Sequence, residues 1–184
     1  DPIKSDHMAD NIDGMAAFSS RGPTDDGRLK PDISAPGTFI LSAKSRSTTD
    51  TGWGAYDSEY TYMGGTSMAT PLTAGATALI LEHLNSNLGM TNPSSALVKT
   101  IFIVGADEMT GQYGDATNGA GESIPNNNEG WGRVNLGGMI NSSYVDKETV
   151  STGEFREFSF NVPPGKSDLK VALSYNDPAG DPAV

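Results

Sequence analysis

The sequence predicts a mixed α/β fold that is followed by the start of a second, all-β region. Strand-like runs at residues 38–43 and 60–63 come before two helical patterns at residues 66–84 and 93–104. The chain has 184 residues, which is long enough to bury a core. From about residue 146 apolar and polar residues alternate, as is typical of strands.

Two runs in the first part of the chain predict strands. Residues 38–43, TFILSA, are nearly continuously apolar at their centre, which predicts a buried strand. Residues 60–63, YTYM, are rich in aromatic and β-branched side chains, which favour strands. A shorter strand is expected at residues 16–20, before the turn that begins at Gly22. Residues 31–37, PDISAPG, contain too many prolines for a helix.

The clearest helical pattern covers residues 66–84. From Leu72 onward almost every residue is small or apolar, so we expect a helix that is buried on nearly all faces. Pro71 is expected in the first turn, where a missing N–H has little effect. A second helix is expected over residues 93–104, capped by Asn92.

The pattern of apolar and polar residues changes near residue 145. Residues 158–162 and 169–175 are two alternating runs with a Pro-Gly turn between them, which predicts a hairpin. Two strands alone are marginally stable in water. We therefore expect residues 1–145 to form one domain and residues 146–184 to be the incomplete beginning of a C-terminal β-sandwich or jelly-roll domain.

Charge and composition exclude several classes of partner. The formal net charge is −11, which argues against nucleic acid and anionic membrane surfaces. No apolar stretch approaches the 18 or so residues that a membrane span needs. The chain has no cysteine, which excludes a disulfide scaffold, a cysteine nucleophile and a thiolate metal site.

Residues 64–71, GGTSMATP, stand where the first helix begins. The first backbone N–H groups of a helix have no partner within it, and the helix dipole places partial positive charge there. An oxyanion formed by attack of Ser67 on a carbonyl would accept a hydrogen bond from the Ser67 N–H. A Thr-Ser pair at a helix start is more often a simple cap, so the assignment depends on the wider pattern.

That wider pattern resembles the subtilisin-like serine proteases. Beginning at Gly65, Gly-Thr-Ser-x-Ala-x-Pro-x-x-Ala-Gly matches the serine signature of the family at each fixed position. Residues 18–23, 30–37 and 130–135 resemble successive blocks of the same family. The resemblance covers about residues 9–145 and is strongest to alkaline subtilases with a C-terminal β-barrel or jelly-roll domain.

The resemblance implies the C-terminal part of a three-layer α/β/α fold with a mostly parallel sheet. It also implies a secreted, extracellular serine endopeptidase that acts on protein or peptide substrates through an acyl-enzyme on Ser67. No cofactor is required for that chemistry.

The sequence lacks the rest of the machinery that the family uses. Neither the family's His-Gly-Thr-His block nor the Gly-Asn block of the oxyanion hole is present, and we expect both, with the triad Asp, upstream of residue 1. His83 lies 16 residues after Ser67 on the same predicted helix, roughly 24 Å away. His7 is in a predicted loop, and Asp32 is expected to be structural. The chain alone is therefore expected to be inactive and to need the missing N-terminal half.

Several alternatives stay open at this point. The chain can instead be a non-catalytic binding or association module with a protease-derived fold, and the fragment can self-associate through an exposed edge or apolar surface. Met68 either lines the site, where it is open to oxidation, or packs. The acidic loop at residues 107–129 is either solvated or holds a structural calcium ion. The aromatic residues before Ser67 either border a substrate cleft or pack against one another: Trp53, Tyr56, Tyr60 and Tyr62. Asn141 begins a glycosylation sequon, a triplet that is also common by chance.

Overall fold

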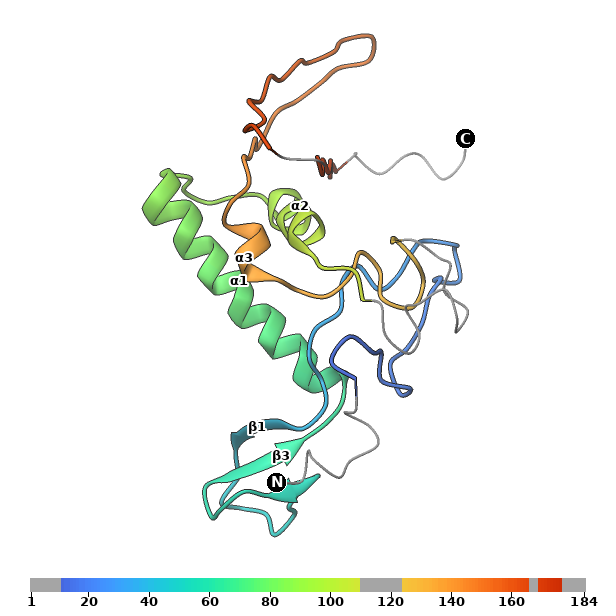
Figure 1. The fold of residues 1–184 in the computed structure, drawn as a ribbon, viewed down its shortest axis with the longest axis vertical. Coiled ribbons are helices and arrows are strands. Elements are labelled where there is room, and N and C mark those ends of the chain that lie inside the picture. Colours follow the sequence, from blue (N-terminus) through green and yellow to red (C-terminus); the bar gives the residue numbers. More distant parts are fainter. Residues whose placement is uncertain (1–10, 110–123, 166–168, 177–184) are drawn as a thin grey trace.

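The computed structural model describes residues 11–109, 124–165 and 169–176. The strands are β1 (Ile40–Ala43), β2 (Gly54–Ala55) and β3 (Tyr60–Met63), and the helices are α1 (Thr66–Leu88), α2 (Ser95–Gly105) and α3 (Leu136–Met139). The small sheet lies at one end of the molecule, and α1 runs from it to α2 and α3 at the other end (Figure 1).

The sheet is antiparallel, with the strand order β1-β3-β2. Strands predicted at residues 38–43 and 60–63 are confirmed as β1 and β3. The predicted burial of the first strand is wrong, because β1 is an edge strand and three of its four residues are exposed. The strand expected at residues 16–20 is also wrong, because these residues form a turn in which the Ser19 N–H donates to the Ala16 carbonyl at 2.9 Å.

The predicted helix at residues 66–84 is confirmed as α1, which continues to Leu88. It ends where Gly89 takes a left-handed conformation with φ of 65°. Burial on nearly all faces is wrong: only a stripe of residues four apart is buried, and the helix keeps exposed leucines elsewhere. The buried residues are Ala76, Ile80 and Leu84, and the exposed leucines include Leu72, Leu79 and Leu81.

Pro71 lies in the second turn of α1, as the sixth residue of the helix, and not in the first turn as predicted. Proline has no N–H, so the carbonyl of Ser67, four residues earlier, lacks its usual helical donor. Nearby, the Thr70 hydroxyl donates to the Thr66 carbonyl at 2.9 Å. The interruption of the helical hydrogen bonds therefore falls at Ser67.

The core joins α1 to α2 and α3. Leu97, Ile101 and Phe102 of α2 form one cluster with the buried stripe of α1 and with Met139 of α3. Helix α2 begins at Ser95, two residues later than predicted, and its cap is Ser94, not Asn92. The Ser94 hydroxyl accepts a hydrogen bond from the Leu97 N–H at 3.0 Å.

Residues 130–134 close the structure by joining two distant segments. Arg133 forms a parallel bridge with Ser34 and an antiparallel bridge with Asp107. The bridge to Ser34 is a single parallel pairing, whereas the sheet of the described residues is antiparallel and does not show the mostly parallel sheet that the resemblance implies. A side chain at Gly132 would put its Cβ 2.2 Å from the Asp107 carbonyl oxygen, so only glycine allows this close approach.

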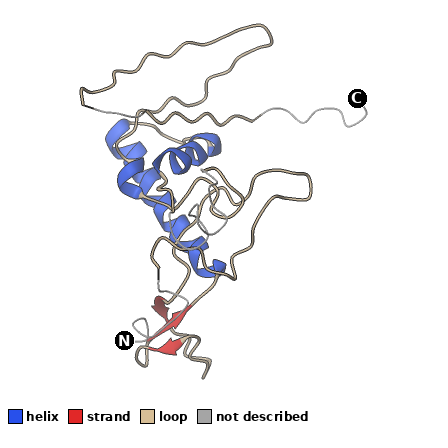
Figure 2. Cartoon of the chain, turned by 45° about the vertical axis from the view of Figure 1, so that its right-hand side comes forward, coloured by secondary structure: helices blue, strands red, loops and turns tan. Residues whose placement is uncertain are grey.

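Residues 146–176, here called the extension, form no strand over their described parts, 146–165 and 169–176. The predicted hairpin is therefore not formed there, and the apolar side chains of the two runs are exposed. The extension leaves the molecule at the end that holds α2, far from the sheet (Figures 1 and 2). The domain boundary at residue 145 and a β-sandwich beyond it remain predictions.

Candidate active site

Ser67 is the second residue of α1 and is exposed. Strand β3 reaches it through Gly64 and Gly65. The Gly65 N–H donates to the Gly37 carbonyl at 2.7 Å. A Cβ on Gly64 would lie 2.1 Å from the Trp53 ring, and Gly65 has a φ of 138°. Both glycines are thus required by the local geometry that presents Ser67.

The start of α1 is electrostatically open to an anion. Gly65 gives no side-chain cap, and the first turn contains no acidic residue. The N–H groups of Met68 and Ala69 donate to the Gly65 carbonyl at 3.0 and 3.4 Å. The N–H groups of Thr66 and Ser67 precede them and have no acceptor within the helix. The first turn of α1 therefore supplies no carboxylate to offset the positive end of the helix dipole, where Ser67 lies.

The described residues contain no general base within reach of Ser67. The Ser67 hydroxyl has no hydrogen-bond partner among them. His83 lies on the same helix, about 24 Å away by helical rise. Its Nδ1 is 2.8 Å from the Asn87 side-chain nitrogen. His7 lies outside the described residues.

Asp32 is held by two lysines. Lys99 of α2 lies 2.7 Å from its carboxylate, and Lys30 bonds to the other carboxylate oxygen. Partial burial acts to raise the pKa of Asp32, but the hydrogen bonds and charges of Lys30 and Lys99 outweigh it and hold the pKa below the usual value of 3.8. This agrees with the structural role predicted for Asp32, which ties the bend at residues 30–34 to α2.

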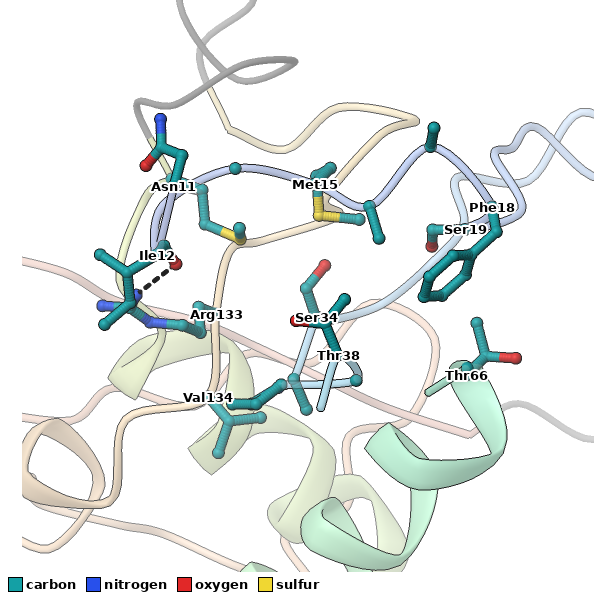
Figure 3. Close-up of a pocket in the computed structure, with 18 residues that line it drawn as sticks. Asn11, Ile12, Met15, Phe18, Ser19, Ser34, Thr38, Thr66, Arg133 and Val134 are labelled. Atoms are coloured by element: carbon teal, nitrogen blue, oxygen red, sulfur yellow. Dashed lines mark hydrogen bonds between the residues drawn. The ribbon is translucent and has the colours of Figure 1, made fainter. Parts of the chain in front are cut away.

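A cavity of about 560 Å³ borders the start of α1 (Figure 3). Thr66 lines it from the helix, and Met15 and Phe18 line it from the N-terminal loop. Arg133 closes one side, where its Nη1 donates to the Asp13 carboxylate at 2.8 Å and to the Ile12 carbonyl at 3.1 Å. Ser67 does not line the cavity, which therefore lies beside Ser67 and does not enclose it.

Sequence reasoning missed the role of Arg133 and its partner Asp13. Arg133 lies within residues 130–135, which resemble a block of the family, and these residues give no sign of a partner 120 residues earlier. A second missed residue is Glu129, which is completely buried. Its carboxylate accepts hydrogen bonds from the Met109 N–H at 2.8 Å and from the Asn126 side chain at 3.0 Å.

The aromatic residues before Ser67 pack against one another. The Trp53 ring meets Phe39 edge to face at a centroid distance of 5.1 Å, and Phe39 meets Tyr62 at 6.0 Å. Tyr56 meets Tyr62 at 6.1 Å and is 61% exposed. These contacts support the packing interpretation for this group.

The calcium prediction is untested by the described part of the chain. Asp115, Asn118 and Glu122 of the acidic loop lie outside it. The Asp107 carboxylate accepts a hydrogen bond from Asn135 at 2.9 Å, and Glu129 is bonded as described above. Among the described residues no group of three His, Cys, Asp or Glu side chains is placed to hold a metal ion.

Comparison with known proteins identifies the class. The Subtilase family (Peptidase_S8) matches residues 8–132, and the chain belongs to this family. The serine protease/ABC transporter B family protein tagB of Dictyostelium discoideum is 36% identical over 152 residues, 71% of this chain and 8% of that protein. The serine protease AprX of Bacillus subtilis is 40% identical over 121 residues, 61% of this chain and 26% of that protein.

A solved structure gives the same answer. The structure of the Clostridium perfringens CspB protease is similar with a TM-score of 0.52 and 29% sequence identity, over 69% of this chain and 23% of that one. The predicted α/β subtilisin-like fold is thereby confirmed. The chain spans about a quarter or less of the length of these three proteins. Within the described residues, no helix is both long and apolar enough to cross a bilayer.

Proposed function

We propose that this chain carries the nucleophile of a serine endopeptidase and that Ser67 is that nucleophile. The observation that supports the proposal is the exposed Ser67 at an uncapped helix start, within the serine signature of the subtilase family. An isolated serine hydroxyl is a weak nucleophile, so the reaction needs a base as well as this geometry.

In the proposed reaction the Ser67 oxygen attacks the carbonyl carbon of a peptide bond, and its proton passes to the base. The tetrahedral oxyanion accepts a hydrogen bond from the Ser67 N–H, at the positive end of α1. The intermediate then expels the amine, which takes the proton, and leaves an acyl-enzyme. Water attacks the acyl group, returns the proton to Ser67 and releases the acid.

The base, its supporting acid and the second oxyanion donor are proposed to come from an N-terminal half outside these 184 residues. The sequence contains neither block that supplies them in the family, and His83 is too far from Ser67. Exposed apolar side chains on both flanks of the buried stripe of α1 support this partner: Leu72 and Leu79 lie on one flank and Leu81 on the other, and they are between 38% and 55% exposed. The chain alone is proposed to be inactive, and the assembled enzyme to act outside the cell on proteins or peptides.

The test is covalent labelling by a fluorophosphonate probe, read by intact mass. Ser95 provides a matched control, since it is an exposed serine at the first position of α2. The chain alone is expected to stay unlabelled. A longer polypeptide that includes the N-terminal half should label once per molecule, and Ser67→Ala should abolish this while Ser95→Ala preserves it.

Two results would overturn parts of this proposal separately. Stoichiometric labelling of the chain alone would show that the base lies within it. Labelling that survives in Ser67→Ala would remove Ser67 from the nucleophile role.

A non-catalytic association module is the second candidate, favoured by the same exposed leucines of α1. It predicts that the longer polypeptide binds its partner but never labels. Size-exclusion chromatography of the purified chain, at low and high concentration, reports whether the chain self-associates.

A further inference from the structure

Helix α2 supplies no charge of its own at either end. Its first turn contains no acidic residue and its last turn no basic one. A helix is stabilised by negative charge near its N-terminus and by positive charge near its C-terminus. In this chain both charges come from the extension, from residues that are 52 and 64 positions away from their contacts on α2.

At the N-terminal end of α2, Asp146 binds the cap residue. One carboxylate oxygen accepts the Ser94 N–H at 2.9 Å, and the other accepts the Ser94 hydroxyl at 2.5 Å. Ser94 is the residue that caps α2, so the carboxylate lies beside the positive end of the helix dipole. Charge-assisted hydrogen bonds of this kind are the stronger ones in proteins.

At the C-terminal end, Lys170 binds the residue that follows the helix. Its Nζ donates to the Ala106 carbonyl at 3.2 Å. Ala106 is the C-cap of α2 and is almost completely buried. The ammonium group therefore satisfies a carbonyl at the negative end of the dipole.

Side-chain exposure in residues 170–175 agrees with this contact. Ala172 and Ser174 are half-buried, whereas Val171, Leu173 and Tyr175 are exposed by 77%, 83% and 71%. In an extended chain alternate residues face opposite sides. Lys170, Ala172 and Ser174 therefore share one side of this segment, and Ala172 and Ser174 are less exposed than their neighbours. The apolar side chains of Val171, Leu173 and Tyr175 face outward on the other side.

The backbone at the first contact is held in an uncommon conformation. Asn92 and Lys147 are two of the non-glycine residues with positive φ, at 53° and 62°. They face each other, because the Lys147 Nζ donates to the Asn92 carbonyl at 2.6 Å. Such conformations persist where surrounding contacts fix them. The junction between residue 145 and the extension is therefore a fixed joint and not a loose linker.

We propose that the extension is an electrostatic strap for α2: Asp146 and Lys170 bind the two ends of the helix and complete its missing end charges. The strap stabilises α2, and α2 packs through Leu97 and Ile101 on the buried stripe of α1, the helix that carries Ser67. The extension thus supports the nucleophile helix through α2, without itself touching the start of α1.

Hydrogen–deuterium exchange of the α2 amides in the 184-residue chain tests the strap. Asp146→Asn is expected to speed exchange in the first turn, reported by the Leu97 amide, roughly two- to fivefold. Lys170→Met is expected to speed exchange in the last turn, at Val104 and Gly105, by a similar factor. The double variant should show both changes, and 0.5 M salt should shrink the difference from the wild-type chain.

Matched controls remove charges in the extension that make no contact with α2. Glu148→Gln removes an exposed carboxylate two residues after Asp146, and Arg156→Gln removes a cation that donates to the Phe155 carbonyl within the extension. Both should leave α2 exchange unchanged. Equal exchange in wild type, Asp146→Asn and Lys170→Met would overturn the strap. So would acceleration spread evenly over α1 and α2, because that pattern reports general destabilisation.

Discussion

The two ends of α1 differ in burial, in packing and in the chemistry they allow. At the N-terminal end Thr66 and Ser67 are exposed, the cap is a glycine and the helical bonding is interrupted by Pro71. At the C-terminal end Ile80 and Leu84 are buried in a cluster with α2 and α3. One end of the helix is thus fixed by its core, and this leaves the other free to present a reactive group.

The largest expected effect comes from truncating a buried side chain at the C-terminal end of α1. Leu84→Ala should lower the free energy of unfolding by about 2–5 kcal/mol, because Leu84 is completely buried and a cavity would remain. Leu72→Ala, at an exposed leucine of the other end, should change it by less than about 1 kcal/mol. Urea denaturation followed by circular dichroism measures both. Equal losses at the two positions would contradict the comparison.

The exposed end depends on backbone geometry instead of burial. Gly65→Ala should destabilise the fold by about 1–3 kcal/mol, because a φ of 138° is unfavourable for any side chain. It should also slow probe labelling of Ser67 in the assembled enzyme. Gly75→Ala is the control on the same helix: its added Cβ meets nothing within 4 Å, and it should stabilise the helix by roughly 0.5–1 kcal/mol. A Gly65→Ala protein of full stability and labelling rate would show that the glycine is dispensable.

A smaller effect is expected at the cap of α2, which supports the fixed end. Ser94→Ala should cost about 1 kcal/mol, since it removes the acceptor for the Leu97 N–H and the donor to Asp146. Ser95→Ala, one residue later, should change stability by less than about 0.5 kcal/mol. Thermal denaturation of the two variants gives the comparison. Indistinguishable midpoints would mean that Ser94 is not the functional cap.

The smallest effect concerns Asp32, which ties the bend at residues 30–34 to α2 through Lys99. Its pKa is lowered in the folded chain because its two lysines outweigh partial burial. The stabilisation is therefore fully present above the usual pKa of 3.8 and is lost as the pH falls through the lower, folded value. Denaturation midpoints of wild type and Asp32→Asn should differ at pH 6 and converge as the pH falls below the usual value of 3.8. A difference that does not change with pH would contradict this assignment.

Patterns among neighbouring residues predicted where α1 begins, whereas contacts between residues far apart in the sequence were not predicted. The Gly-Gly link, the helix after it and the strand before it follow from neighbouring residues. Burial of α1 was overestimated because composition shows how apolar a helix is, but not which of its faces another element covers. The cap of α2 was assigned to Asn92 because the sequence offers several capping residues there. Ser94 is the cap that Asp146 binds, from 52 residues away.

The candidate site shows the same contrast between features set by neighbouring residues and contacts between distant segments. Ser67 follows from a contiguous signature, and its catalytic role is still a prediction. The salt bridge between Arg133 and Asp13, and the burial of Glu129, depend on contacts between distant segments that no local pattern encodes. The alternating runs of the extension predicted strands by composition, but its described parts form none, because a strand also needs a partner to pair with.

The hydrogen bond between Gly65 and Gly37 fixes the location of Ser67 independently of the length of the loop between β1 and β3. The Gly65 N–H is bonded to the Gly37 carbonyl, while residues 45–50 form the exposed tip of an excursion that leaves through β1 and returns through Trp53, β2 and β3. Insertions or deletions at this tip change only a surface loop, and the hydrogen bond to Gly37 still fixes the location of Ser67. We therefore expect this tip to accept inserted sequence without displacing Ser67.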